Sequence, residues 1–354
     1  MKIEMFFYSL MCIFLIFISK ICAQEQKPQY AGAFLELGIG ARGMAMGEAY
    51  VSVADDGSAF YWNPAGAATL PRTDVSGMYA SLFKGLVKHF QIGLTRPLYR
   101  DIAISLNWIR LSVPNVQQFA SLAMDDSTRT NDSRVTSAAD DPFGFWRQFA
   151  LTQQSSGVIK SNDDAFFITF AKQNKINIDF GWQYFVIPVT IPMGFNVKLI
   201  RQNLFDKQGS ALGVDFGTMF KFGLDDLMDN NSLGKISFGL AIKDIWNTKV
   251  KWNTDSLRSD KINRSWNIGG SYLQPFPSVG GELLVAYSYR PHVNSPHKLG
   301  FEYTYYERLA IRFGLSNEKV TAGIGLKISP FYLDYAFRSH EFGGSHRINT
   351  SIRF

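Results

Sequence analysis

SHRINTSIRF, residues 345–354, is the stretch of sequence that decides the fold. Its residues alternate between an apolar and a polar set: Ile348, Thr350, Ile352 and Phe354 against Arg347, Asn349, Ser351 and Arg353. Because successive side chains of a strand point to opposite faces, such a strand has one apolar face and one polar face. With its final aromatic residue it is typical of the closing strand of a membrane β-barrel, since inside lipid only helices and closed barrels satisfy every backbone group.

The same alternation recurs after about residue 72, in segments of about 9 to 11 residues, the length that a tilted membrane strand needs. The clearest copies are 309–316, 319–328 and 331–338. Further candidate strands cover 73–83, 87–96, 101–111, 164–173, 193–203, 210–222, 234–245, 264–273, 280–290 and 297–305. In a barrel the polar face lines the lumen, so we expect these charges there: Lys298, Glu302, Arg312, Lys327, Asp334 and Arg338.

A doubtful further strand at 175–187 would bring the count to 15. Bacterial single-chain barrels have even strand counts, and Pro188 and Pro192 cannot donate to a β-ladder. We therefore expect an all-β fold, a transmembrane antiparallel barrel of about 14 strands. Whether 174–192 is strand or insertion stays open.

Residues 1–23 have the features of a secretory signal peptide, with Lys2, an apolar run over 5–18 and a small residue at Ala23. A lipoprotein site at Cys22 is disfavoured because Lys20 and Ile21 stand where small residues are expected. Both cysteines, Cys12 and Cys22, lie in this segment. The mature chain then excludes thiolate metal sites and cysteine nucleophiles.

Without the signal the chain has 34 basic and 29 acidic residues, a net charge of +5 that is spread along the sequence. No basic block is interleaved with aromatic residues, so we do not expect nucleic-acid binding. The aromatic content of 15% fits the interfacial girdles of a membrane barrel.

Residues 24–71 are not strand-like, and 32–70 are rich in Gly and Ala, with a helical pattern over 41–53. Asp55, Asp56 and Ser58 supply capping side chains for a second short turn. A compact segment ahead of the first strand is expected to fold into the lumen as a plug. The barrel then comprises residues 72–354.

A segment of weak strand character, 112–163, interrupts the barrel pattern, and we expect a long surface loop over the barrel mouth. Four acids in it could bridge divalent ions to lipopolysaccharide, although a solvated loop is the favoured interpretation: Asp125, Asp126, Asp140 and Asp141.

Residues 37–70, LGIGARGMAMGEAYVSVADDGSAFYWNPAGAATL, resemble the N-terminal signature of the PorV/PorQ family, itself similar to the FadL long-chain fatty-acid transporters. The Asn-Pro-Ala motif of the FadL plug is matched by Asn63, Pro64 and Ala65. The resemblance implies a bacterial outer-membrane protein, and PorV-like members serve type IX secretion by receiving cargo for surface attachment. The 174–192 stretch departs from the pattern, and no residue is recognisable as a fatty-acid ligand.

The plug motif Asn63, Pro64, Ala65 and Gly66 has a physical interpretation of its own. Pro64 fixes φ, Asn63 bonds nearby backbone and Gly66 permits a close turn. Together these residues predict a rigid corner that holds the plug against the wall.

Four plug glycines, Gly38, Gly40, Gly43 and Gly47, are predicted to permit tight packing. The first three match part of the dinucleotide-binding fingerprint, with Asp55 downstream as a ribose acid. No βαβ pattern follows them, so we expect no cofactor.

Catalysis has weak support. A cluster of polar residues near the C-terminus could supply the Ser/His pair of a lipid hydrolase, but a solvated loop explains it equally well. The cluster comprises Ser339, His340, Glu341, Ser345 and His346. No orienting acid is identifiable and no spacing indicates a metal site, so we expect a non-enzymatic protein with neither catalytic nor metal-ligating residues.

Two functions remain. In the first, the barrel is a type IX secretion component whose outer loops bind exported cargo. In the second, it is a FadL-like passive transporter of hydrophobic small molecules, which such barrels can release sideways through the wall. Outer-membrane lipid and lipopolysaccharide are expected partners in both cases. The sequence does not identify cargo, ligand or oligomeric state.

Overall fold

The computed structural model describes residues 31–118, 157–179, 186–204, 207–228, 230, 232–254, 259–291, 296–316, 319–339 and 343–354. The predicted signal peptide, the cleavage site and the four loop acids lie outside these residues. Within them, no helix is long and apolar enough to cross a lipid bilayer.

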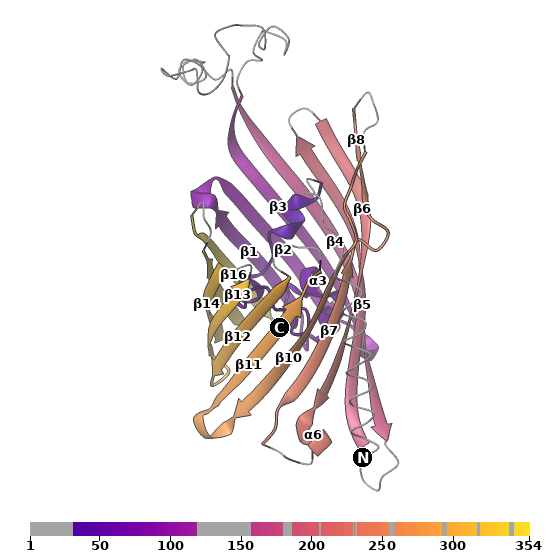
Figure 1. Ribbon diagram of the computed structural model, residues 1–354, viewed down its shortest axis with the longest axis vertical. Helices are drawn as coiled ribbons and strands as arrows, with labels where there is room; N and C mark the ends of the chain where they lie inside the picture. Colours follow the sequence, from indigo (N-terminus) through magenta and orange to yellow (C-terminus); the bar gives the residue numbers. More distant parts are fainter. Residues whose placement is uncertain are drawn as a thin grey trace.

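Fourteen of the strands in this part of the chain form one closed antiparallel barrel, which confirms the predicted fold (Figure 1). Each strand pairs with its neighbours in sequence, β16 pairs with β1, and β5 pairs with β6, so the sheet has no free side. The barrel strands are β1 (Asp74–Leu82), β2 (Val87–Pro97), β3 (Ile102–Gln118), β4 (Gly157–Asp179), β5 (Val186–Leu204), β6 (Lys207–Gly223), β7 (Lys235–Lys243), β10 (Ser265–Phe276), β11 (Gly281–Tyr289), β12 (His297–Tyr305), β13 (Leu309–Ser316), β14 (Lys319–Ile328), β15 (Phe331–Arg338) and β16 (Ser345–Arg353). Two short strands, β8 (Lys249–Trp252) and β9 (Ser259–Lys261), form a hairpin against β6.

The outer face of the barrel is apolar and the inner face is polar. On β13, Ile311 and Phe313 are 59% and 44% exposed, whereas Arg312 between them is 6% exposed. A water-soluble protein places such residues the other way round. The barrel therefore presents to its surroundings a surface that suits lipid.

The described parts of the stretch 174–192 belong to the two strands on either side of it. β4 runs to Asp179, and β5 begins at Val186 and contains both prolines. Pro188 lies beyond the last residue paired with β6, and the β5–β6 pairs pass from Thr190 directly to Met193. The missing N–H groups thus fall at the end and at a gap of that ladder, which is why a strand with two prolines persists here.

The strands around the predicted surface loop are longer than expected. β3 continues to Gln118 and β4 starts at Gly157, so residues 112–118 and 157–163 are strand rather than loop. Both faces of these ends are rich in polar residues, which is why no alternation marks them in the sequence. The stretch between them lies outside the described residues.

The plug lies inside the barrel, as the predicted fold requires. It consists of η1 (Ala33–Glu36), α2 (Ala41–Ala45), α3 (Ala59–Trp62) and η2 (Pro64–Thr69), joined by turns. The helix expected over 41–53 is wrong beyond Ala45, because Gly47 and Glu48 both adopt positive φ, which ends a right-handed helix. Asp56 does accept hydrogen bonds from the N–H and hydroxyl of Ser58, just before α3.

The two ends of the barrel differ. At the end where β1 begins and β16 finishes, called the terminal end here, the connections include η4 (Tyr99–Asp101), α6 (Leu224–Met228) and η5 (Pro277–Val279). The opposite end, called the far end, carries η3 (Phe83–Gly85) and the β8–β9 hairpin, and it is where β3 ends and β4 begins, with 38 residues between them in the sequence (Figure 1). Short turns at one end and long loops at the other are typical of membrane barrels, whose long loops are extracellular.

Candidate functional site

Seven glycines on the inner face of the wall, the glycine belt, contact the plug directly. The belt comprises Gly194, Gly217, Gly239, Gly269, Gly300, Gly314 and Gly323, on β5, β6, β7, β10, β12, β13 and β14. A Cβ at Gly194 would lie 2.6 Å from the Pro64 carbonyl carbon, and one at Gly300 would lie 2.5 Å from the Met46 oxygen. The belt is absent from the sequence-based predictions, although glycine inside a strand signals close backbone approach.

The predicted Asn-Pro-Ala motif sits against this belt. Asn63 is fully buried, and its Nδ2 donates to the Val51 oxygen at 2.8 Å and to the Thr218 oxygen at 3.1 Å. Its Oδ1 accepts from the Ala65 N–H at 3.2 Å, which caps η2 with Pro64 in the first position. At Gly66 a Cβ would overlap the Ala54 oxygen. The motif thus ties the plug to β6, while its role in function stays a prediction.

The four predicted plug glycines also lie in close contacts. Gly38 and Gly40 have φ of 78° and 76° and face Met44 and Ser58, and Gly43 lies under the Trp62 ring. Gly47, with φ of 61°, faces the backbone of β12 and β13.

On the terminal side of the plug, Arg42 joins the plug to the wall. Its Nε and Nη2 donate to the two Glu302 oxygens at 2.8 and 2.7 Å. Arg312 also donates to Glu302, and to Asp334 at 2.6 Å. Such two-pronged charged hydrogen bonds are the strong ones in proteins.

On the far side, Glu48 of the plug accepts hydrogen bonds from Lys298 and Arg338 of the wall. Burial opposes its charge, but the two cations lower the pKa of Glu48 to about 2. Glu48 is therefore ionised at neutral pH. Glu36 makes a similar pair with Arg290.

The predicted lumen charges therefore do face inward, yet several of them anchor the plug. Lys298, Glu302, Arg312 and Arg338 all bind plug residues or each other. Lys327 instead lies near Glu307, at 3.6 Å.

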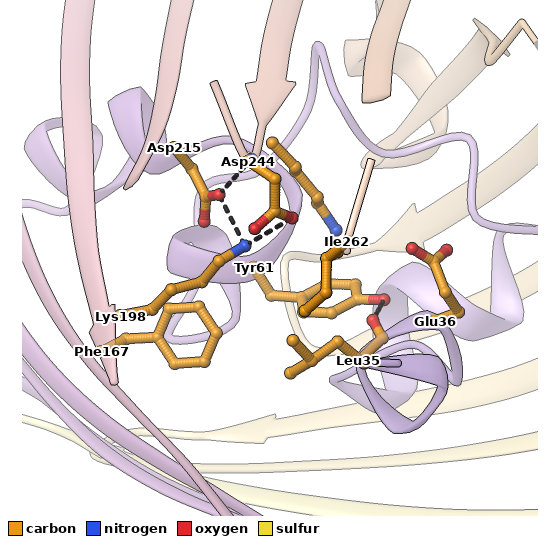
Figure 2. A pocket seen from close by; sticks show the side chains of 10 residues that line it. Leu35, Glu36, Tyr61, Phe167, Lys198, Asp215, Asp244 and Ile262 are labelled. Atoms are coloured by element: carbon orange, nitrogen blue, oxygen red, sulfur yellow. Dashed lines mark hydrogen bonds and ion pairs between the residues drawn. The ribbon is translucent and has the colours of Figure 1, made fainter. Parts of the chain in front are cut away.

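A buried charged cluster beside the plug completes the wall contacts (Figure 2). Lys198 Nζ donates to Asp215 at 2.7 Å and to Asp244 at 2.8 Å, and the Tyr61 hydroxyl donates to the Leu35 oxygen at 2.6 Å. The cavity among these side chains has a volume of about 10 Å³, room for about one water molecule. This cluster is structural rather than a ligand site.

Buried apolar side chains of β3, β5 and β8 line part of the far-end lumen. Phe34 and Leu35 of η1 belong to the same buried cluster as Ile109, Ile200 and Val250. The η1 turn of the plug thus belongs to the hydrophobic core of the lumen.

A large apolar groove runs over the outer face of β5, β6, β7, β10 and β11, with a volume of about 1030 Å³. It is lined by outward-facing Phe238 and Tyr287, and also by Met219 and Gly239 of the inner face. Met219 lies beside the gap in the β5–β6 ladder, where Thr218 Oγ1 donates to the Pro192 oxygen at 3.2 Å. The groove therefore approaches the plug where the wall hydrogen bonding is incomplete.

The Ser/His cluster does not assemble in the described residues. Ser345 faces the lumen, whereas His346 faces outward and its Nδ1 lies 2.8 Å from the Tyr335 hydroxyl. His340 and Glu341 lie outside the described residues. Within the described part of the chain, no group of three or more His, Cys, Asp or Glu residues is placed to hold a metal ion.

No protein-family model and no curated protein matches the chain. Among solved structures it is similar to the Pseudomonas putida toluene transporter TodX, with 10% identity over 94% of this chain and 99% of that chain and a TM-score of 0.46. A Pseudomonas aeruginosa FadL homologue has 9% identity over 87% and 95%, with a TM-score of 0.39. CdiB from Escherichia coli has 9% identity over 80% and 63%, with a TM-score of 0.39. These similarities are weak and concern the fold alone.

Proposed function

We propose that this chain is a bacterial outer-membrane protein, exported by its signal peptide, that lets small hydrophobic molecules cross the membrane. This is the second of the two functions drawn from the sequence. The apolar outer face and closed barrel support the location. The groove that reaches the ladder gap is the observation that carries the proposed activity.

Entry would use the apolar far-end lumen. Phe34 and Leu35, at 3% and 8% exposure, belong to the buried apolar cluster of this region. Since burial of apolar surface is the dominant force in such contacts, a hydrophobic molecule offers the same walls an alternative partner. Displacement of residues 31–37 would then admit it.

Exit would run sideways rather than through the plug. The glycine belt and the Glu48 and Arg42 anchors hold the plug to the wall on both sides. At the gap beside Pro192 two positions of each strand are unpaired, so fewer ladder hydrogen bonds oppose separation of β5 from β6 there, and the outer groove beyond it is apolar. A hydrophobic molecule leaving there enters lipid without crossing water.

A disulfide across the gap tests this route. In Met193→Cys/Thr218→Cys, the two residues are directly opposite on β5 and β6, next to the gap. We expect uptake of a radiolabelled aromatic hydrocarbon to fall to the level of a deletion strain and to recover on reduction, because the staple prevents the strands from parting. The control pair Val197→Cys/Val214→Cys spans intact ladder on the same strands and should leave uptake unchanged. Equal uptake by the oxidised Met193→Cys/Thr218→Cys variant and the wild type would refute the route.

The PorV-like role in type IX secretion is a second candidate. It is favoured by the length of β3, β4, β5 and β6, which have 17, 23, 19 and 17 residues, whereas about 9 to 11 suffice to span a membrane. Part of the surplus lies at the far end, where residues 112–118 of β3 pair with residues 157–162 of β4, and an exported protein could bind there. Unchanged surface and medium proteomes in the deletion strain would rule out this role, whereas loss of proteins bearing the secretion signal would support it.

A further inference from the structure

A charged cluster interrupts the apolar outer face where β3, β4 and β5 leave the apolar band. Arg110 binds Asp164 through two hydrogen bonds, of 2.7 and 2.9 Å, and Trp108 Nε1 donates to the same carboxylate at 2.8 Å. The Arg110 guanidinium lies 4.9 Å from the centre of the Trp108 ring. These contacts hold a guanidinium, 39% exposed in its side chain, on the outer face of the barrel.

Two further cations flank this pair. Arg201 lies opposite Asp164 in the β4–β5 register, and Lys88 lies opposite Ser112, one outward row beyond Arg110. Both are exposed. Arg110 and Arg201 thus lie on either side of Asp164 in the strand register, with Lys88 two strands from it, so these four residues carry a net positive charge.

An apolar groove of about 540 Å³ begins directly beneath Arg110. Tyr79, Phe90, Ile92 and Trp108 line it, and Gly77 forms its floor. A Cβ added at Gly77 would meet only the Gln91 oxygen, at 3.8 Å, so space above this residue is open. A groove that is apolar along its length and has cations at one end is complementary to an amphipathic anion.

We propose that the outer wall from β1 to β5 binds a phosphorylated glycolipid of the lipid A class, with its phosphates on Arg110, Arg201 and Lys88 and an acyl chain over Gly77. The far end, with its long loops, faces the cell exterior, where this lipid forms the outer leaflet. Guanidinium groups suit phosphate oxygens because their donors form a planar fork. Cations spread over β2, β3 and β5 suit a headgroup with two phosphates better than one with a single phosphate.

Native mass spectrometry of the purified barrel, titrated with lipid A, tests the site. Lys88→Gln/Arg201→Gln should weaken lipid A binding at least about a hundredfold, since each lost charged hydrogen bond accounts for about tenfold or more. Arg96→Gln/Lys172→Gln is the matched control, because it removes two exposed outward cations of β2 and β4 near the terminal end. Gly77→Val should weaken binding by filling the groove, whereas Gly270→Val, in the groove that has no lysine or arginine in its lining, should not.

Ligand variants complete the experiment. Lipid A without its phosphates and phosphatidylglycerol should each bind at least about tenfold more weakly than lipid A, because each lacks the paired phosphates that the three cations match. Equal binding of dephosphorylated lipid A, equal binding of phosphatidylglycerol, or full binding by Lys88→Gln/Arg201→Gln would each overturn the proposal. None of these results depends on hydrocarbon uptake.

Discussion

A Gly47→Val variant is expected to lose the folded, plugged barrel. Gly47 has φ of 61°, which a β-branched residue avoids. Its Cβ would lie 2.7 Å from the Leu315 nitrogen and 2.8 Å from the Leu299 oxygen, both backbone atoms of the wall. Strain at such a position costs about 1 to 3 kcal/mol, and the overlap with β12 and β13 adds to it.

Two measurements detect the loss. If the barrel no longer folds, the compact band of unheated protein disappears from a gel. If the barrel folds without its plug, the lumen is open and the cells take up a large hydrophilic antibiotic. Gly77→Val, at an outward-facing glycine with open space around it, should retain both the band and the barrier. A Gly47→Val protein with a normal band in impermeable cells would contradict the seating of the plug described above.

Glu48→Gln is expected to destabilise the plugged barrel by about 3 to 5 kcal/mol, the usual effect of removing one partner from a buried ion pair. The change leaves Lys298 and Arg338, whose side chains are 7% and 18% exposed, facing a neutral group. The denaturant concentration at which the compact gel band is lost should fall accordingly.

Glu307→Gln is the matched control. Glu307 also lies near a lysine, Lys327, but at 3.6 Å and with its side chain 83% exposed. Exposed pairs contribute about 0 to 1 kcal/mol, so this midpoint should barely move. Equal shifts for Glu48→Gln and Glu307→Gln would show that Glu48 is not a buried anchor.

The alternation of side chains predicted every strand of the barrel because lipid outside and a polar lumen inside act on each residue in turn. Segments such as 309–316 and 345–353 therefore match their expected positions closely. Where no lipid contacts the strand, as at 112–118 and 157–163, both faces hold polar residues and the signal vanishes. Pro188 and Pro192 obscured the start of β5 for a different reason. The sequence does not show where the β5–β6 ladder ends or where it lacks a pair, and these are the positions that accommodate the prolines.

The candidate site was only half predictable. The turn at Asn63 and Pro64 was predictable because it depends on neighbouring residues, through the cap on the Ala65 N–H and the fixed φ of Pro64. The glycine belt and the Glu48 anchor depend on which wall residue meets which plug residue, and Glu48 and Lys298 are 250 positions apart. The lumen charges were placed on the correct face, but their pairing with the plug required the register of the strands.

The position of residues 31–70 inside a closed barrel is tested most directly by oxidative cross-linking in membranes. Ser237 Oγ donates to the Ser52 oxygen at 2.8 Å, and the chain has no cysteine after Cys22. Ser52→Cys/Ser237→Cys should form a disulfide that speeds migration on a non-reducing gel, whereas Ser52→Cys/Ile236→Cys, with the second thiol on the outer face of β7, should stay reduced. If both pairs stay reduced or both cross-link equally, the plug does not lie against the inner wall of this barrel.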